Sequence, residues 1–124
     1  MFHILLVEDD GHFRKILKQQ LSHWFPSVLI EEASDSQEAM EKMESFHPQL
    51  IFMDIRLPGE SGLELTKKIR AKHPTSDVVM LTSHDLPEYQ RAAIECGAAH
   101  FFVKGTSEGI EIRSLVESLL KRVK

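Results

Sequence analysis

The chain has 124 residues, of which 42% are hydrophobic and 27% are charged, and its formal net charge is −4. This length suits one globular domain with a single core, so we expect residues 1–124 to fold as one unit. The acidic balance argues against a dedicated nucleic-acid surface, and no apolar run approaches the ~18 residues of a membrane span. Because Cys96 is the single cysteine, an intramolecular disulfide is excluded, and we expect a cytoplasmic protein.

The chain begins with an apolar strand, predicted over residues 2–7, that runs directly into three acids. Apolar residues then recur on one face of a helix between residues 13 and 24, and Arg14 and Lys18 fall on its outer face. Asp10 is expected to cap this helix, because a carboxylate there accepts hydrogen bonds from free backbone N–H groups. The three acids are Glu8, Asp9 and Asp10.

A second strand is predicted over residues 28–30, and the polar residues 34–36 are suited to cap a second helix. Pro48 ends that helix, since proline cannot continue it. The two acids after the strand, Glu31 and Glu32, are assigned to a solvated rim and no further role.

Residues 50–62, which read LIFMDIRLPGESG, are the stretch around which the chain is organised. Four apolar residues run into Asp54, and such a short run between proline-containing turns is typical of a strand buried on both faces. The acid therefore ends a central strand, where ligands collect in open parallel sheets. Ser61 and Glu64 have the spacing of a capping box and start the third helix.

A fourth buried strand is predicted over residues 78–81, with Thr82 at its end. The next helix is expected to start with a capping box at residues 85–88; its apolar face is weak, so we expect it to be the most mobile element. A fifth strand over residues 98–103 ends in Lys104. The last helix has the clearest helical repeat, at Ile112, Leu115, Val116, Leu119, Leu120 and Val123.

Five apolar strands alternating with five amphipathic helices predict an α/β fold, a parallel sheet covered on both faces. The strand ends of such a sheet share one edge, so Asp54, Thr82 and Lys104 should lie near the acid pair Glu8 and Asp9. Crowded carboxylates repel one another, and a hard cation such as Mg²⁺, or Mn²⁺ in its place, resolves that repulsion. With a lysine and a hydroxyl nearby to hold a dianion, the central acid can act as a nucleophile toward phosphorus. The residues therefore predict phosphoryl transfer to Asp54.

Four segments, LLVEDD, MDIRLPGESG, MLTS and FFVKG, are similar in order and spacing to those of receiver domains of two-component response regulators, the CheY-like superfamily. The resemblance covers essentially the whole chain. It implies a flavodoxin-like (βα)5 fold with a five-stranded parallel sheet in the order 2-1-3-4-5 and helices on both faces. It also implies a phosphorelay module that catalyses only its own Mg²⁺-dependent phosphorylation and dephosphorylation.

The resemblance implies a role for each residue of the predicted site. Asp54 would accept a phosphoryl group from a sensor histidine kinase or a phosphotransfer protein. Mg²⁺ would be bound by Asp9 directly, by Glu8 through water, by Asp54 and by the backbone carbonyl of Arg56. The residues that would hold the phosphoryl oxygens are Thr82 and Lys104.

Signal output in such domains runs through the surface of the fourth helix, fifth strand and fifth helix, with Thr82 and Phe101 as the switch residues. Three features depart from the usual pattern. Gly105 takes the place of a proline that many receivers carry after the site lysine, so no cis bond is assumed. Phe101 lacks the hydroxyl of the tyrosine often found there. Arg56 lies two residues after Asp54, and His84 lies two residues after Thr82. Both are expected to set the lifetime of the phosphorylated state.

Three alternatives remain open at this point. A phosphatase or phosphotransferase usually has a second acid two residues after its nucleophile, where this chain has Arg56, and a cap insertion for which 124 residues leave no room. A degenerate receiver that binds proteins constitutively is opposed by the presence of all five site residues. The chain carries no output domain, so it is either a stand-alone receiver or a fragment of a longer regulator. Its downstream partner would be a protein target or an output domain that is absent from this chain. A homodimer formed through the output surface after phosphorylation is also expected to be feasible. Direct binding of nucleic acid by this domain is not expected.

Overall fold

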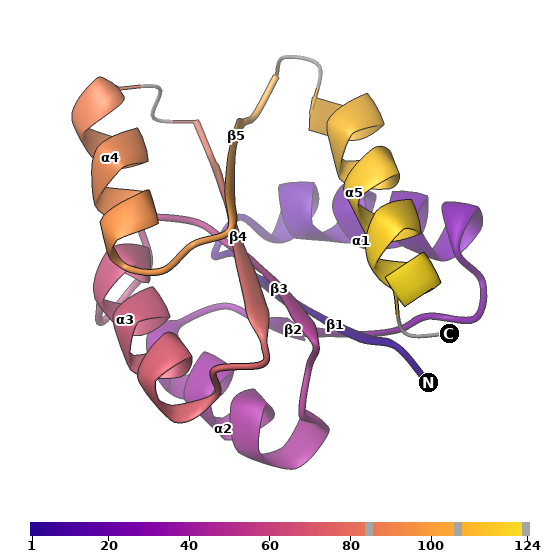
Figure 1. Cartoon of the computed structure of the whole chain (residues 1–124), viewed down its shortest axis with the longest axis horizontal. Helices are drawn as coiled ribbons and strands as arrows, with labels where there is room; N and C mark the ends of the chain where they lie inside the picture. The colour runs from indigo at the N-terminus through magenta and orange to yellow at the C-terminus, as the bar shows by residue number, and fades with distance from the viewer. Residues whose placement is uncertain (84–85, 106–107, 123–124) are drawn as a thin grey trace.

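The computed structural model describes residues 1–83, 86–105 and 108–122, over which strands and helices alternate (Figure 1). This alternation confirms the pattern of apolar runs and amphipathic stretches in the sequence. The elements are β1 (His3–Val7), α1 (Gly11–Trp24), β2 (Leu29–Ala33), α2 (Ser36–Phe46), β3 (Leu50–Met53), α3 (Gly62–Lys72), β4 (Asp77–Thr82), α4 (Pro87–Glu95), β5 (His100–Val103) and α5 (Glu108–Arg122).

The five strands form one parallel sheet in the order β2-β1-β3-β4-β5, which confirms the predicted flavodoxin-like topology. The central strand β3 is buried along its whole length. Val7 of β1 and Met53 of β3 are partners in the register, so both strands end at the same level. The residues that follow them, Glu8 and Asp54, therefore leave the sheet side by side.

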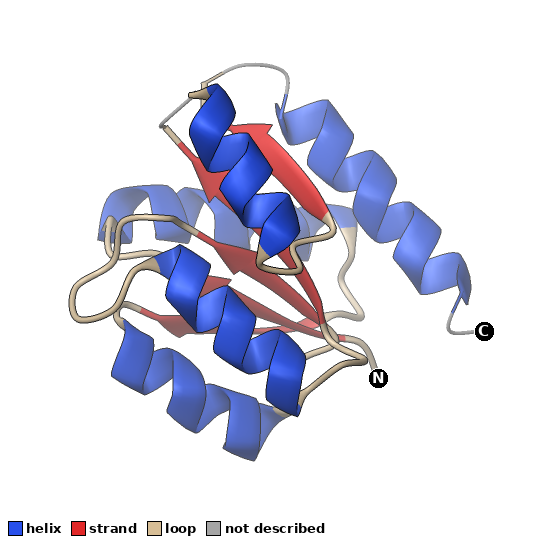
Figure 2. Cartoon of the chain, turned by 60° about the vertical axis from the view of Figure 1, so that its left-hand side comes forward, coloured by secondary structure: helices blue, strands red, loops and turns tan. Residues whose placement is uncertain are grey.

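Helices cover both faces of the sheet, with α1 and α5 on one side and α2, α3 and α4 on the other (Figures 1 and 2). Successive strand residues point to opposite faces, so Leu6 joins one core cluster and Leu5 the other. The buried helix residues of the first cluster are Leu17, Leu21, Ile112, Val116 and Leu119, and those of the second are Ala39, Met43, Leu65, Ile69 and Ala93.

Side-chain caps start the first three helices, as predicted. The Asp10 carboxylate accepts hydrogen bonds from the backbone N–H groups of His12 and Phe13 at 3.1 and 3.2 Å. Asp35 accepts from the Glu38 N–H at 2.8 Å, and Ser61 from the Glu64 N–H at 3.2 Å. These bonds satisfy N–H groups that have no partner inside the helix.

The prediction for the second strand was wrong in its position and in the role of its acids. Strand β2 spans Leu29–Ala33, so Glu31 and Glu32 lie inside it rather than beyond its end. Pairing with all five residues of β1 extends the strand through these acids. Both acids also have cationic partners, Lys42 for Glu31 and Arg14 with Lys18 for Glu32, so they are not a merely solvated rim.

Helix α4 is anchored weakly, as predicted, because Ala93 is the one residue that it buries. The helix begins at Pro87 with Leu86 at the cap position, and no side chain caps it. Residue 85 of the predicted capping box, like Val123 of the last helix, lies outside the described residues. The mobility expected of α4 stays a prediction. In the three described ranges, no helix combines the length and the apolar character needed to cross a membrane.

Candidate functional site

Three carboxylates from the ends of two neighbouring strands converge at one edge of the sheet. Glu8 and Asp9 follow β1, Asp54 follows β3, and one oxygen of each carboxylate lies within 4.8 Å of the others. The backbone N–H of Asp54 donates to the Val7 carbonyl at 3.1 Å, which continues the sheet pairing into the site. Glu8 and Asp54 are 5% and 8% exposed, whereas Asp9 is exposed. The predicted acid cluster therefore exists, with two buried members and one open to solvent.

Lys104, at the end of β5, is the counter-ion of the two buried carboxylates. Its Nζ forms an ion pair with Glu8 and lies 3.3 Å from Oδ2 of Asp54. Its backbone N–H donates to the Thr82 carbonyl at 2.9 Å, which ties the ends of β4 and β5 together. The side chain thus reaches across the end of β4 to the acids beside β3 and β1. The sequence predicted that the lysine would lie at this edge but not that Glu8 would be its partner.

Each buried carboxylate divides its oxygens between the lysine and a backbone N–H group. Oδ1 of Asp54 accepts a hydrogen bond from the Ile55 N–H at 2.7 Å, and Oδ2 contacts Lys104. Oε2 of Glu8 accepts from the Asp10 N–H at 3.1 Å, and Oε1 contacts Lys104. These contacts fix the orientation of both carboxylates before any ligand binds.

Burial is the main influence on the pKa of Glu8. It raises the pKa of Glu8 from 4.5 to about 7, against hydrogen bonds from Lys104 and the Asp10 N–H, which lower it. The nearby charge of Asp54 raises this pKa further. Burial lowers the pKa of Lys104, but the bond with Glu8 and the charge of Asp54 outweigh it, so the pKa is raised overall. The lysine is therefore charged at neutral pH, while Glu8 binds or releases a proton near neutrality.

This raised pKa predicts that the protein without a bound cation loses stability as the pH rises. The folded state binds a proton that the unfolded chain releases, so the stabilisation is complete below pH 4.5 and is lost through pH 7. We expect the free energy of unfolding, measured with urea and EDTA, to fall by roughly 2 kcal/mol between about pH 5 and about pH 8. The stabilisation from Glu32, whose pKa is lowered by Arg14 and Lys18 despite its burial, is lost only at lower pH.

The matched control is Glu8→Gln, which should remove most of this pH dependence because it removes the titrating group. Mg²⁺ should stabilise the original protein more at about pH 8 than at about pH 5, since a cation favours ionised carboxylates. An unchanged pH slope in Glu8→Gln would show that other groups cause the loss.

Arg14 is a site-supporting residue that the sequence analysis placed wrongly on the outer helix face. One guanidinium nitrogen donates to the Glu8 carbonyl at 2.5 Å, and Nε donates to Glu32 at 2.8 Å. Lys18 also contacts Glu32, at 3.2 Å. Arg14 thus joins α1, the end of β1 and β2 next to the acid pair. No sequence signal pointed to this contact, because the predicted second strand ended before Glu32.

The loop after Asp54 is hydrogen-bonded to the first residues of both α3 and α2. The Gly62 N–H donates to the Ile55 carbonyl at 2.7 Å, and the Glu60 N–H donates to the Ser36 hydroxyl at 3.3 Å. A Cβ at Gly62 would lie 1.9 Å from the Asp54 carbonyl oxygen, so only glycine allows this approach. The position of the acid therefore depends on Gly62, a role that the sequence analysis missed.

The remaining predicted residues are placed around the cluster with different exposure. Thr82 is completely buried at the end of β4. Phe101 is half-buried and packs against the second core cluster, and the side chain of Arg56 is exposed. His84 lies outside the described residues. Gly105 has φ +84°, and the described peptide bonds are all trans.

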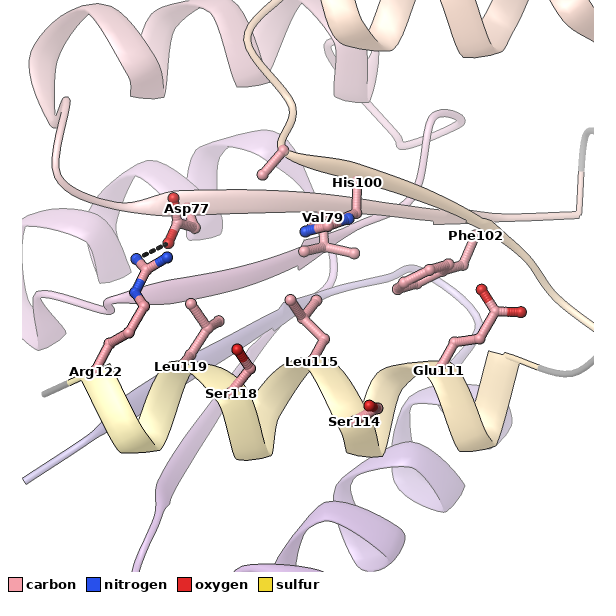
Figure 3. A pocket seen from close by; sticks show the side chains of 11 residues that line it. Asp77, Val79, His100, Phe102, Glu111, Ser114, Leu115, Ser118, Leu119 and Arg122 are labelled. Carbon is pink, nitrogen blue, oxygen red and sulfur yellow. Dashed lines mark ion pairs between the residues drawn. The ribbon is translucent and has the colours of Figure 1, made fainter.

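A hollow remote from the acids lies among the described residues. It measures about 480 Å³ and lies between α5 and the strands β4 and β5, where Arg122 approaches Asp77 at 3.8 Å (Figure 3). The hollow that Glu8 and Asp54 line measures only about 10 Å³, room for about one water molecule. This small hollow has no room for an organic molecule, and the acid cluster reaches solvent through Asp9.

The donor set fits a hard divalent cation. Glu8, Asp9 and Asp54 offer carboxylate oxygens, the ligands that Mg²⁺ and Mn²⁺ prefer, and the exposed Asp9 leaves room for the waters that Mg²⁺ retains. Lys104 contacts two of these carboxylates, so a cation would compete with the lysine for their oxygens.

Comparison with known proteins decides the family. The family model described as the response regulator receiver domain matches residues 4–117. The chain belongs to the response regulator receiver family. It is 30% identical over 112 residues to the transcriptional activator protein ExaE of Pseudomonas putida, covering 90% of this chain and 52% of ExaE. It is 33% identical over 120 residues to the response regulator protein GraR of Staphylococcus saprophyticus, covering 97% of this chain and 52% of GraR.

Solved structures agree with this assignment. A two-component response regulator from Clostridium difficile superposes with a TM-score of 0.90 at 27% identity, over 100% of this chain and 99% of that chain. This receiver is therefore a module of two-component signal transduction. It spans about half the length of ExaE and GraR.

Proposed function

We propose that the receiver accepts a phosphoryl group on Asp54 from a phosphohistidine of a sensor kinase or phosphotransfer protein. The observation that carries the proposal is the meeting of Asp54, Glu8, Asp9 and Lys104 at one open edge of the sheet. The Asp54 carboxylate attacks phosphorus, a P–O bond forms, and the P–N bond to the donor imidazole breaks. A small acyl phosphate can replace the protein donor, since the acceptor site supplies the positioning.

The residues of the site divide the work between metal binding and charge neutralisation. Glu8, Asp9, Asp54 and the Arg56 carbonyl would hold Mg²⁺, which neutralises charge on the phosphoryl oxygens when bound. Nζ of Lys104 lies 3.3 Å from Oδ2 of Asp54, so the ammonium needs to move only a short distance to contact a phosphoryl oxygen.

Phosphorylation would act as a switch through the ends of β4 and β5. A phosphoryl group of nearly two negative charges attracts the Thr82 hydroxyl and Lys104, whose backbones are hydrogen-bonded to each other. Phe101 is half-buried and α4 buries one residue, so this part of the molecule can be rearranged at low cost. The surface of α4, β5 and α5 would then bind a target protein, a further domain or a second copy of the chain in the cytoplasm.

Arg56 and His84 would tune the lifetime of the phosphorylated state. The Arg56 side chain is exposed two residues after the acceptor, where it can shield the phosphoryl group from attacking water. We expect Arg56→Ala to change the dephosphorylation rate about threefold or more in a phosphate-release assay. An unchanged rate would remove Arg56 from this role.

Intact mass spectrometry after incubation with acetyl phosphate tests the proposal. We expect the mass of one added phosphoryl group with Mg²⁺, none with EDTA, and none in Asp54→Asn, which keeps the shape of the side chain. A folded protein that binds Mg²⁺ but gains no phosphoryl group would overturn the proposal and favour a constitutive binding module. The grouping of all three acids with Lys104 argues against that alternative.

A further inference from the structure

The ammonium group of Lys104 contacts the ring of Phe13 in addition to its two carboxylate partners. Nζ of Lys104 lies 4.3 Å from the ring centroid, within the range of a cation–π contact. The ring also packs against the first core cluster. The Phe13 N–H donates to the Asp10 cap at 3.2 Å, so the acidic segment after β1 fixes the residue that contacts the lysine.

The other described contacts of the ammonium group are all with site carboxylates. They are the ion pairs with Glu8 and Asp54, and both carboxylates are candidate cation ligands. Beyond the lysine the backbone turns at Gly105 with φ +84°, and apart from its chain neighbours no atom of the described residues lies within 4 Å of where a Cβ would stand there. Gly105 has no side chain that could pack against the lysine.

We propose that Phe13 is a positioning residue that keeps the Lys104 ammonium at the phosphoryl position when a cation takes its carboxylate partners. The aromatic face attracts the ammonium but offers no ligand to Mg²⁺, so it does not compete for the metal. Without the ring, the freed lysine would swing toward solvent and would have to be ordered again when the phosphoryl group arrives. This role rests on the proposed phosphorylation of Asp54.

Beryllofluoride, a phosphoryl analogue, provides the binding test in the presence of Mg²⁺. We expect Phe13→Leu to weaken beryllofluoride binding about threefold to tenfold, because the ring contact is lost while apolar packing is kept. Mg²⁺ binding in the absence of beryllofluoride should change less than about twofold, since Phe13 supplies no ligand. Phe13→Tyr should bind beryllofluoride with the original affinity, because it retains the aromatic face. Phe13→Met is a second variant without a ring and should behave like Phe13→Leu.

A double-mutant cycle separates positioning from general support of the fold. In a Lys104→Gln background, Phe13→Leu should have no further effect on the phosphorylation rate, because the cation that the ring positions is absent. An equal loss in both backgrounds, or unchanged beryllofluoride affinity in Phe13→Leu, would overturn the proposal.

A spectroscopic measurement tests the contact even if the protein takes no phosphoryl group. The ring current of Phe13 should shift the NMR signals of the Lys104 ε-CH2 protons upfield with Mg²⁺ bound, and Phe13→Leu should remove that shift. Failure of beryllofluoride to bind the original protein would count against the proposed function, whereas the lysine shift would still decide the positioning role. Equal lysine shifts in both proteins would overturn that role.

Discussion

Gly62→Ala is expected to lower the free energy of unfolding by roughly 3 kcal/mol or more, because the added methyl group overlaps backbone atoms. Its Cβ would lie 1.9 Å from the carbonyl oxygen of Asp54, 2.9 Å from its carbonyl carbon and 3.0 Å from Cα of Ile55. No side chain can rotate to relieve these contacts, so the loop after β3 must move away from α3.

That movement displaces the candidate acceptor together with its neighbour. The Ile55 N–H holds Oδ1 of Asp54 at 2.7 Å, so a shifted backbone also turns the carboxylate. We therefore expect slower phosphorylation of the folded fraction as well as a lower urea midpoint.

Gly109→Ala is the matched control, because Gly109 also lies in a helix but, outside its own helix, no atom of the described residues lies within 4 Å of its Cβ position. Alanine there should leave stability unchanged or raise it by about 0.5–1 kcal/mol. If Gly62→Ala proved as stable as this control, the close approach of α3 to Asp54 would be wrong.

Lys104→Gln is expected to affect phosphorylation and Mg²⁺ binding in opposite directions. The phosphorylation rate should fall by roughly 100-fold or more, since a charge aimed at the developing phosphoryl oxygens is lost. Mg²⁺ should bind several-fold more tightly, because the ammonium no longer competes for Glu8 and Asp54. Without Mg²⁺, the free energy of unfolding should fall by roughly 2–3 kcal/mol, since two buried acids lose their counter-ion.

Lys18→Gln is the control for the loss of a lysine in an ion pair. Lys18 contacts Glu32 at 3.2 Å with its side chain 42% exposed, so its removal should cost at most about 1 kcal/mol. Calorimetric Mg²⁺ titration of both variants provides the comparison. Weaker Mg²⁺ binding in Lys104→Gln than in Lys18→Gln would contradict competition between the lysine and the cation.

Most of the fold could be predicted because most elements carry a local signal, although β2 extends through two acids beyond its apolar run. Buried strands appear as apolar runs and helices as amphipathic repeats. Asp10, Asp35 and Ser61 are of the residue types that favour the N-cap position, so they indicate where the first three helices begin. The parallel sheet then places the acids at one edge, which made the meeting of Glu8 and Asp54 predictable from topology alone.

The supporting contacts could not be predicted, because they depend on distances between elements. Arg14 has the spacing of an outer-face residue, and only the packing of α1 beside β1 and β2 brings it to the Glu8 carbonyl. The pairing of Lys104 with Glu8 requires a reach across the end of β4. Gly62 looks like an ordinary turn glycine until the backbone of Asp54 is placed against it.

Chemical mapping of the phosphoryl group tests the central claim most directly. Borohydride reduces an acyl phosphate to an alcohol, so an aspartyl phosphate becomes homoserine, which peptide mass spectrometry can locate. After incubation with acetyl phosphate and Mg²⁺, we predict homoserine at position 54 alone, and none when EDTA replaces Mg²⁺. A phosphorylated protein with homoserine at another acid, such as Asp9, or with no homoserine at all, would contradict Asp54 as the acceptor.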